Sequence, residues 1–278
     1  MDRFAYQPVD EKSVVYHYCS PDTLLAILKS RSIRLSDVSC MNDSKELLWG
    51  LGALEETLSI GESYESQKDR LSEVFSQYMS SVKVLAACFS THSDMLSQWR
   101  AYGSDGSGFA IGFSGAEICS LPGSTVQICY DPAEQKEMWQ AGLAHAFTAS
   151  QRDGKLDQSD FLRQFILLML DLASMKNPAF SEEGEVRLVH PVLVETREGI
   201  SMMKYPAREK FHAPEIQFQM RGSTPAAFVD LPFTSGTQPI REIVIGPRAE
   251  VAERSIAMLL GNLGYGPITV RKSAASYR

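Results

Sequence analysis

The 278-residue sequence has no apolar stretch long enough to cross a membrane. Its longest run of strongly apolar residues is Phe165–Leu170, whereas a transmembrane helix needs about 20 such residues. The first residues, MDRFAYQPVDEK, also lack the apolar segment of a secretory signal. We therefore expect a soluble, cytoplasmic protein with no membrane partner.

Cysteine is scarce, and positive charge is not in excess. The five cysteines form no CxxC pair, which is typical of proteins from a reducing compartment. The 27 lysines and arginines are outnumbered by 34 aspartates and glutamates, which gives a net charge of −7. Proteins that coat nucleic acids carry the opposite balance, so we expect no broad affinity for nucleic acid.

Several catalytic and metal-binding motifs are also missing. The five histidines show neither an HExxH motif nor another paired spacing, so the sequence predicts no metal site. It lacks the G-x-S-x-G motif of one large class of serine hydrolases. No internal repeat is present, which excludes solenoids and propellers.

The residues that are present suit one globular domain, because 44% are apolar and can form a sizeable core. We predict a single α+β domain over residues 1–278, with a mixed central sheet, an N-terminal helical layer and a helical insertion at about 132–176. The glycine-rich turn 103–108 should lead into a strand that forms a hairpin with 125–130. Strands are expected at 14–18, 32–35, 82–89, 109–113, 125–130, 185–194, 210–212, 227–231, 240–245 and 268–271, and helices at 21–30, 43–57, 63–80, 95–102, 133–150, 159–175 and 250–263.

His17 lies in the first predicted strand, between two tyrosines. In most proteins such a histidine belongs to the core and bonds to neighbouring backbone groups. The alternative is a histidine whose N–H holds a ribose hydroxyl, with a tyrosine nearby to stack on a planar ring.

The end of the strand at 82–89 carries the sequence CFSTHS. Cys88 and His92 are candidates for a thiolate and its base. However, Cys88 belongs to the apolar run, which favours a buried, inert cysteine. Ser90 lies just beyond that run and is better placed to act at the rim of a cleft.

The segment SQWRAY contains a candidate anion site. Trp99 and Tyr102 share one helical face, which is most often a core-packing face. Arg100 points elsewhere and suits a phosphate, to which the turn 103–108 would also present backbone N–H groups. A tight connection into the next strand explains the glycines of this turn equally well.

The acidic segment SEEGEVR is the most unusual cluster. Strand alternation predicts that Glu183, Glu185 and Arg187 share one face. Two neighbouring carboxylates raise each other's proton affinity, and an arginine counters this effect. The cluster either stabilises a developing cation or forms a solvated strand end with a weak ion pair.

Short segments along nearly the whole chain resemble the bacterial family of unknown function DUF2971. The family name implies no activity. The segments that carry the resemblance are YHYCS (16–20), MNDSKE (41–46), CFS (88–90), SQWRAY (97–102), KNPAFSEEGEVR (176–187), REIVIGP (241–247) and RKS (271–273).

A second resemblance, to the ADP-ribosyltransferase superfamily, rests on the order His17, Ser90–Thr91 and Glu183-Gly184-Glu185. It implies that His17 grips the ribose of NAD and that Ser90–Thr91 supports the pocket. It also implies that Glu185 is the catalytic acid and that Glu183 orients the acceptor. The fold is then expected to be ADP-ribosyltransferase-like, with NAD as substrate and no metal.

Three further residues complete the expected cofactor site. We add Arg100 as a pyrophosphate contact and Tyr102 as the candidate for stacking on nicotinamide. Asn42 fits the DUF2971 pattern and is either part of this site or a helix cap. His92 follows Ser90–Thr91 where the superfamily usually has a serine.

The sequence thus leads to an NAD-dependent enzyme that cleaves the nicotinamide–ribose bond. ADP-ribose would pass to a protein or nucleic acid, as in bacterial toxins or phage defence, and the acceptor macromolecule is not identified. One alternative is a non-catalytic protein that binds a nucleotide or a partner through Trp99, Arg100 and Tyr102. The other is a Cys88–His92 thiol hydrolase.

Overall fold

The computed structural model describes residues 6–8, 10, 12–40, 49–54, 56, 80–152, 155–205, 214–234 and 236–277. The strands are β1 (Val14–Cys19), β2 (Ser32–Asp37), β3 (Val82–Ser90), β4 (Phe109–Ser114), β5 (Ser124–Gln127), β6 (Gln151–Arg152), β7 (Lys155–Leu156), β8 (Glu185–Arg197), β9 (Ile200–Lys204), β10 (Gln217–Arg221), β11 (Thr224–Pro232), β12 (Ile240–Ile245) and β13 (Thr269–Lys272). The helices are α1 (Pro21–Ser30), α5 (Leu96–Ala101), α6 (Gly115–Ser120), α7 (Pro132–Ser150), α8 (Gln158–Leu172) and α9 (Glu253–Asn262), with 3₁₀ turns η1 (Val38–Cys40) and η2 (Pro178–Glu183).

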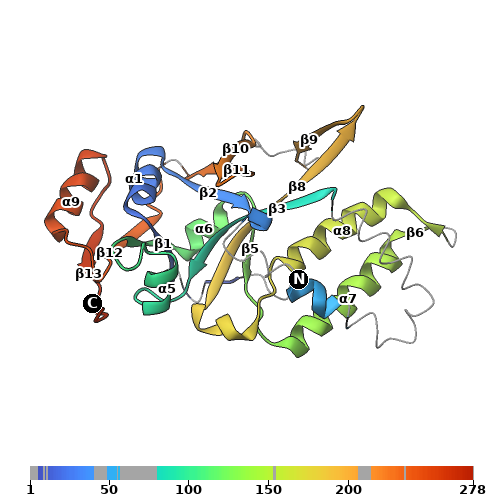
Figure 1. Ribbon diagram of the computed structural model, residues 1–278, viewed down its shortest axis with the longest axis horizontal. Helices are drawn as coiled ribbons and strands as arrows, with labels where there is room; N and C mark the ends of the chain where they lie inside the picture. The colour runs from blue at the N-terminus through green and yellow to red at the C-terminus, as the bar shows by residue number, and fades with distance from the viewer. Residues whose placement is uncertain are drawn as a thin grey trace.

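The chain has an α+β architecture built on one large, mixed, open sheet (Figure 1). The main strand order is β10-β11-β2-β3-β1-β4-β12-β13, and β8 joins β3, β5 and β9. β12 and β13 run parallel, while the other pairs of this sheet are antiparallel. None of the helices in the described ranges has the length and apolar character that a membrane-spanning helix requires.

β3 is the strand on which the sheet divides. On one side it pairs with β8 along its whole length. On the other side β2 pairs with Leu85 and Ala86, whereas β1 pairs only at Ser90. β1 and β2 therefore diverge from a shared neighbour, and α1 connects them (Figure 1).

Two large hydrophobic cores cover the faces of the sheet. Leu85 and Ala87 of β3 point into one core, and Val84 and Ala86 point into the other, as strand alternation requires. The first core packs under α1 and α9. The second packs under α7 and α8, whose largest buried side chains are Trp139, Phe161 and Phe165.

The predicted helix at 21–30 is confirmed, because Ser20 Oγ accepts a hydrogen bond from Thr23 N and Pro21 opens the first turn. The predicted helices at 133–150 and 159–175 are also confirmed as α7 and α8, although α8 ends at Leu172. Of the helix expected at 43–57, only 49–54 and 56 are described, and these are helical. The segments 63–79 and 210–212 lie outside the described residues.

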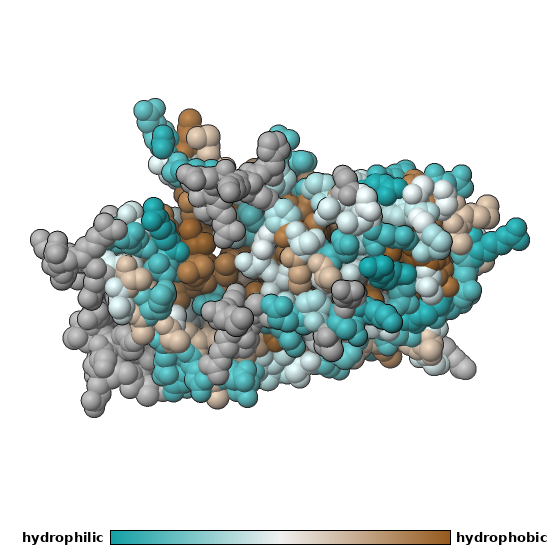
Figure 2. Space-filling view, turned by 180° about the vertical axis from the view of Figure 1, so that it is seen from behind, coloured by the Kyte–Doolittle hydropathy of each residue, from teal (hydrophilic) through white to brown (hydrophobic). Residues whose placement is uncertain are grey.

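The predicted hairpin of 109–113 with 125–130 is wrong. β4 is buried at every position and pairs with β1 and β12, which cover both of its edges. β5 pairs instead with β8. β9 and β10 were not predicted. Both carry exposed apolar residues, Ile200 and Met202 on β9 and Phe218 and Met220 on β10. Hydrophobic residues are visible on the part of the molecule that projects from the rest, which is the β8–β9 hairpin (Figure 1 and Figure 2).

Candidate functional site

A cavity of ≈ 920 Å³ lies where β1 and β2 diverge. Its walls come from β1, α1, β2 and β3, and side chains from β8, β10, β11 and the α5 region reach it. Its volume is typical of cofactor and small-molecule sites, which span about 300–1,000 Å³. The titratable or charged lining side chains that the site uses are His17, Tyr102, Lys176, Glu183, Glu185 and Arg187.

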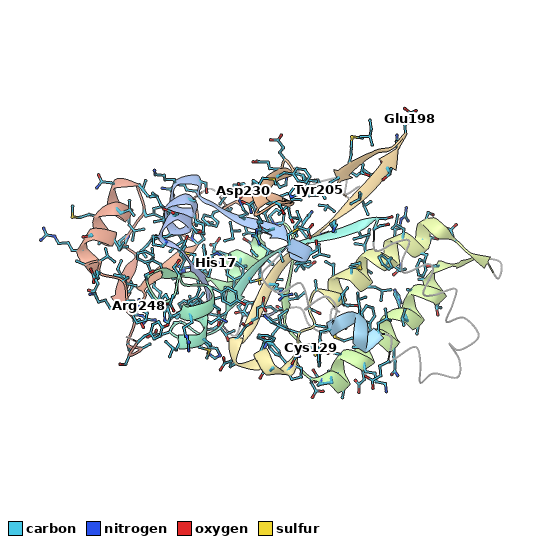
Figure 3. All side chains as sticks on the ribbon, in the orientation of Figure 1. His17, Cys129, Glu198, Tyr205, Asp230 and Arg248 are labelled. Atoms are coloured by element: carbon cyan, nitrogen blue, oxygen red, sulfur yellow. The ribbon has the colours of Figure 1, made fainter. Side chains whose placement is uncertain are left out.

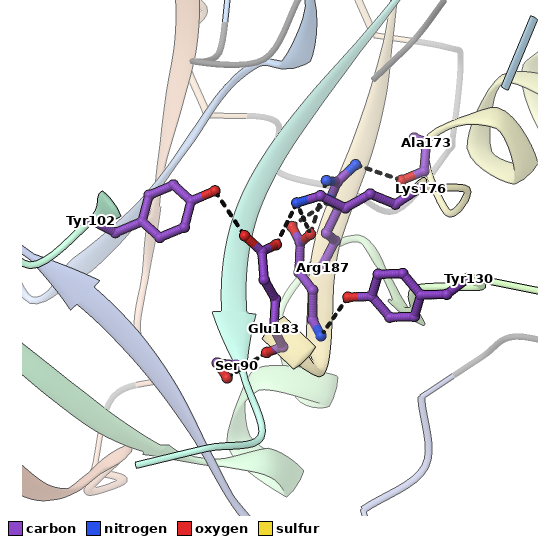
Figure 4. A network of polar contacts seen from close by, with 8 residues as sticks. Ser90, Tyr102, Tyr130, Ala173, Lys176, Glu183 and Arg187 are labelled. Carbon is purple, nitrogen blue, oxygen red and sulfur yellow. Dashed lines mark hydrogen bonds and ion pairs between the residues drawn. The ribbon is translucent and has the colours of Figure 1, made fainter. Parts of the chain in front are cut away.

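Four of these side chains form a connected, charged cluster (Figure 4). Lys176 Nζ donates to Glu183 Oε2 at 2.5 Å and to Glu185 Oε2 at 3.0 Å. Arg187 Nε and Nη2 donate to Glu185 Oε1 and Oε2 at 2.6 and 3.0 Å. All four residues are at most 7% exposed, and their two negative and two positive charges balance, as buried charges must.

The cluster pushes the pKa values of its two carboxyl groups apart. Burial opposes ionisation of Glu185, but the charges of Arg187 and Lys176 outweigh it and lower the pKa of Glu185 to about 2. At Glu183 burial prevails over the attraction of Lys176, and the charge of Glu185 adds to it, so the pKa of Glu183 is raised. Such separation is typical of acid–base sites in which one acid keeps a fixed charge and the other exchanges protons.

A tight turn brings the two acids together. Glu183 is the last residue of η2, Gly184 takes the left-handed conformation with φ 50°, and β8 starts at Glu185. A Cβ on Gly184 would lie 2.5 Å from Thr91 Oγ1 and 2.9 Å from His92 Nε2, so this turn requires glycine. The prediction that Glu183 alternates with Glu185 along one strand is therefore wrong, although both side chains reach the same lysine.

Ser90 and Thr91 attach this turn to the end of β3. Ser90 Oγ donates to the carbonyl oxygen of Glu183 at 2.6 Å, and Thr91 N donates to that of Gly184 at 2.9 Å. Ser90 is 2% exposed, and neither residue lines the cavity. Their contacts therefore brace the backbone that carries the two acids.

His17, on β1, lines the cavity, and Figure 3 labels its position. Its Nδ1 lies 2.9 Å from the carbonyl oxygen of Cys88. A carbonyl only accepts, so Nδ1 carries the proton and Nε2 is the acceptor of the neutral ring. Burial lowers the pKa of His17 and favours this neutral form. The backbone contact expected of a core histidine is present, and it uses the N–H that was expected to hold a ribose.

Two tyrosines contact the acid pair from different sides. Tyr102 OH donates to Glu183 Oε1 at 3.3 Å, and this side chain is 39% exposed and lines the cavity. Tyr130 OH accepts from Glu185 N at 3.1 Å. The sequence had singled out neither Tyr130 nor Lys176 as a site residue. The sequence signal for Lys176 is its place as the first residue of the segment 176–187, which resembles DUF2971.

Other predicted site residues lie away from the cavity. Arg100 is exposed, and its guanidinium lies 5.8 Å from the ring centroid of Tyr277. In the glycine-rich turn, Gly108 packs against the carbonyl oxygen of Cys19. This placement does not support a pyrophosphate role for Arg100 or the turn. Trp99 is fully buried, and Asn42 lies outside the described residues.

Cys88 borders the cavity, whereas the sequence favoured a buried, inert cysteine. It is partly exposed because β1 and β2 diverge on this side of β3, and its thiol adds to the lowering of the pKa of Glu185. His92, its expected base, is exposed and packs near Gly184 instead.

Over the described ranges, no group of three or more histidine, cysteine, aspartate and glutamate residues is placed to hold a metal.

Residues 98–188 match the model of a family described as "Protein of unknown function (DUF2971)". The matched segment begins within α5 and contains β4 and the charged cluster, and the match supports the resemblance found in the sequence. No curated protein and no solved structure matches the chain.

Proposed function

We propose that this chain binds NAD in the cavity between β1 and β2 and cleaves the nicotinamide–ribose bond, passing ADP-ribose to water or to a macromolecular acceptor. The observation that carries the proposal is a register: Ser90 pairs with Tyr16 on one side and with Glu185 on the other. This register places β1, β3 and β8 side by side next to the cavity. Two of the ordered residues on which the ADP-ribosyltransferase resemblance rests, His17 and Glu185, line this cavity, and Ser90 lies on the strand between theirs.

Glu185 suits an electrostatic role in this reaction. Nicotinamide leaves with the electron pair of the glycosidic C–N bond, and the ribose becomes oxocarbenium-like. A preorganised carboxylate stabilises that cation. The low pKa of Glu185, about 2, keeps the group ionised, and its three hydrogen bonds to Arg187 and Lys176 hold it in one orientation.

Glu183 and Tyr102 suit the remaining steps. Attack of water or of an acceptor hydroxyl on the ribose carbon releases a proton, which Glu183 takes because its raised pKa suits a general base. The exposed ring of Tyr102 can stack on nicotinamide. His17 accepts a hydrogen bond from a ribose hydroxyl through Nε2, since its N–H already bonds to Cys88 O.

A second function, nucleotide binding without catalysis, is favoured by one observation. Both oxygens of Glu185 already bond to cationic side chains. A carboxylate neutralised in this way attracts a ribosyl cation less strongly. In that case the cavity holds the nucleotide intact.

Titration with NAD, followed by an assay of nicotinamide release, tests both functions. The wild type is expected to bind and to release nicotinamide. Glu185→Gln should retain binding and lose about 100- to 1,000-fold in release rate. The matched control is Glu195→Gln, which changes a partly exposed, ion-paired glutamate on the same strand and should keep the wild-type rate.

Each contrary result is informative. No binding at millimolar NAD overturns the proposal. Binding without release establishes the second function. Full release by Glu185→Gln shows that this carboxylate is not the stabilising charge.

A further inference from the structure

We infer that Lys176 is a positioning residue for the proposed reaction: it holds Glu183 in its ionised form and directs the second oxygen of that carboxylate toward Tyr102 and the cavity. This inference rests on the proposed function. Lys176 follows α8, so it reaches the acids from a different layer than β8, which carries Glu185 and Arg187.

The two glutamates differ in their number of cationic partners. Glu185 bonds to Arg187 through both oxygens and to Lys176 through Oε2. In the described part of the chain, the one ion pair of Glu183 is with Lys176. Loss of the lysine therefore leaves Glu185 paired with Arg187, whereas Glu183 loses its cation.

Lys176 is itself held firmly. Its backbone N donates to the carbonyl oxygen of Cys129 at 3.1 Å, and its own carbonyl oxygen accepts from Gln135 Nε2 at 2.8 Å. Its Nζ lies 5.1 Å from the ring centroid of Phe180, and the residue is 2% exposed. The ammonium group thus has a defined place, and it fixes one oxygen of Glu183 while Tyr102 OH contacts the other.

Several elements surround Glu183 with titratable or charged groups, and their effects can be separated. Glu185 opposes ionisation of Glu183, and Lys176 favours it through both its charge and its hydrogen bond. Burial raises the pKa of both neighbouring tyrosines, which stay neutral at ordinary pH. These groups are Lys176 after α8, Glu185 and Arg187 on β8, Cys88 on β3, Tyr102 after α5 and Tyr130 before α7.

NMR titration of the Glu183 carboxyl tests the inference without any ligand. The protein is labelled with ¹³C-glutamate, and the signal is assigned through Glu183→Gln. Lys176→Gln is expected to raise the pKa of Glu183 by about 1–3 pH units. Lys204→Gln, which removes an exposed ion pair with Glu195, should leave it unchanged.

An unchanged Glu183 titration in Lys176→Gln overturns the inference. Should this variant not fold, Lys176→Met removes the same charge while keeping a long side chain. It is expected to give the same upward shift, and an unshifted signal there overturns the inference equally.

The pH profile of nicotinamide release gives a second readout that a purely structural role would not move. In Lys176→Gln the ascending limb should shift to higher pH by the same interval as the NMR titration, and Lys176→Arg should return it toward the wild-type position. An unshifted limb overturns the positioning role. A wild type that neither binds nor cleaves NAD overturns the proposed function, and the ligand-free titration still decides whether Lys176 keeps Glu183 ionised.

Discussion

Glu185 keeps its charge inside the protein because Arg187 and Lys176 surround its carboxylate. Its pKa of about 2 in the folded state lies below the ordinary value of 4.5. A carboxyl with a depressed pKa adds stability above its unfolded pKa and loses it as the pH falls to the folded pKa. Glu185 should therefore contribute about 3 kcal/mol at neutral pH, lost between about pH 4.5 and pH 2.

Urea denaturation of the wild type and Glu185→Gln at several pH values measures this contribution. The variant is expected to be less stable at pH 7 and to lose less stability on acidification. Glu250→Gln, at an exposed position, should follow the wild-type curve. Equal acid sensitivity of all three proteins would show that the Glu185 ion pairs are not the source.

Ser90 offers a second prediction for single residues. Ser90→Ala removes a buried hydrogen bond to the carbonyl oxygen of Glu183 and is expected to cost about 1–3 kcal/mol in the free energy of unfolding. Ser107→Ala removes an exposed hydrogen bond to Ser104 O and should change it by less than about 0.5 kcal/mol. Denaturant titration of both variants makes the comparison, and equal costs would contradict the bracing role.

Some residues of the candidate site could be predicted from the sequence, and others could not. The acids and Ser90 stood out because their order along the chain resembles that of the ADP-ribosyltransferase superfamily. Lys176 did not, since a turn separates it from its partners and no periodic spacing links them. The prediction that Cys88 is buried was wrong. Its exposure depends on where β1 and β2 diverge, which is set by strand pairing and not by the local sequence.

Among the elements, the turn at Gly184 has the most specific requirement. Gly184→Ala combines left-handed backbone strain of about 1–2 kcal/mol with a clash against Thr91. Gly199→Ala at the tip of the β8–β9 hairpin has the same strain, with φ 78°, and open space around it. Thermal unfolding should show a larger loss for Gly184→Ala, by about 1–3 kcal/mol.

Nicotinamide release extends the comparison of these two glycine variants to function. Gly184→Ala is expected to slow release because Glu183 and Glu185 flank the altered residue. Gly199→Ala should release nicotinamide at the wild-type rate. Equal stability and equal activity would show that the turn tolerates a side chain.

Elements with local signals were predicted well. The cap and the proline of α1 are readable in the sequence. The strand predicted at Ile240–Ile245, which is mostly apolar, is confirmed as β12. β4 and β5 were paired wrongly because a strand's partner depends on distant segments. The alternation of β10 was not recognised as a strand, since its apolar residues Phe218 and Met220 face outward.

At the scale of the molecule, the helical layer of α7 and α8 is part of the site. Lys176 follows α8, and Arg187 Nη1 donates to the carbonyl oxygen of Ala173 at 2.9 Å. Phe165→Ala, a fully buried position on α8, should cost about 3–5 kcal/mol and reduce nicotinamide release at temperatures where the variant is folded. Leu167→Ala, 49% exposed on the same helix, should change both quantities little. Calorimetry and the release assay provide the measurements, and full activity of folded Phe165→Ala would show that the layer does not support the site.

The division of the sheet at β3 also determines which strands would respond when a ligand binds in the cavity. β1 and β2 are not neighbours, yet each pairs with β3 and each contributes to the cavity wall. A molecule bound between them contacts both strands at once and restrains their independent twisting. Ligand binding should therefore slow the exchange of backbone amide hydrogens with solvent in both strands, with the same midpoint in ligand concentration. This coupling is expected although β1 and β2 do not pair with each other.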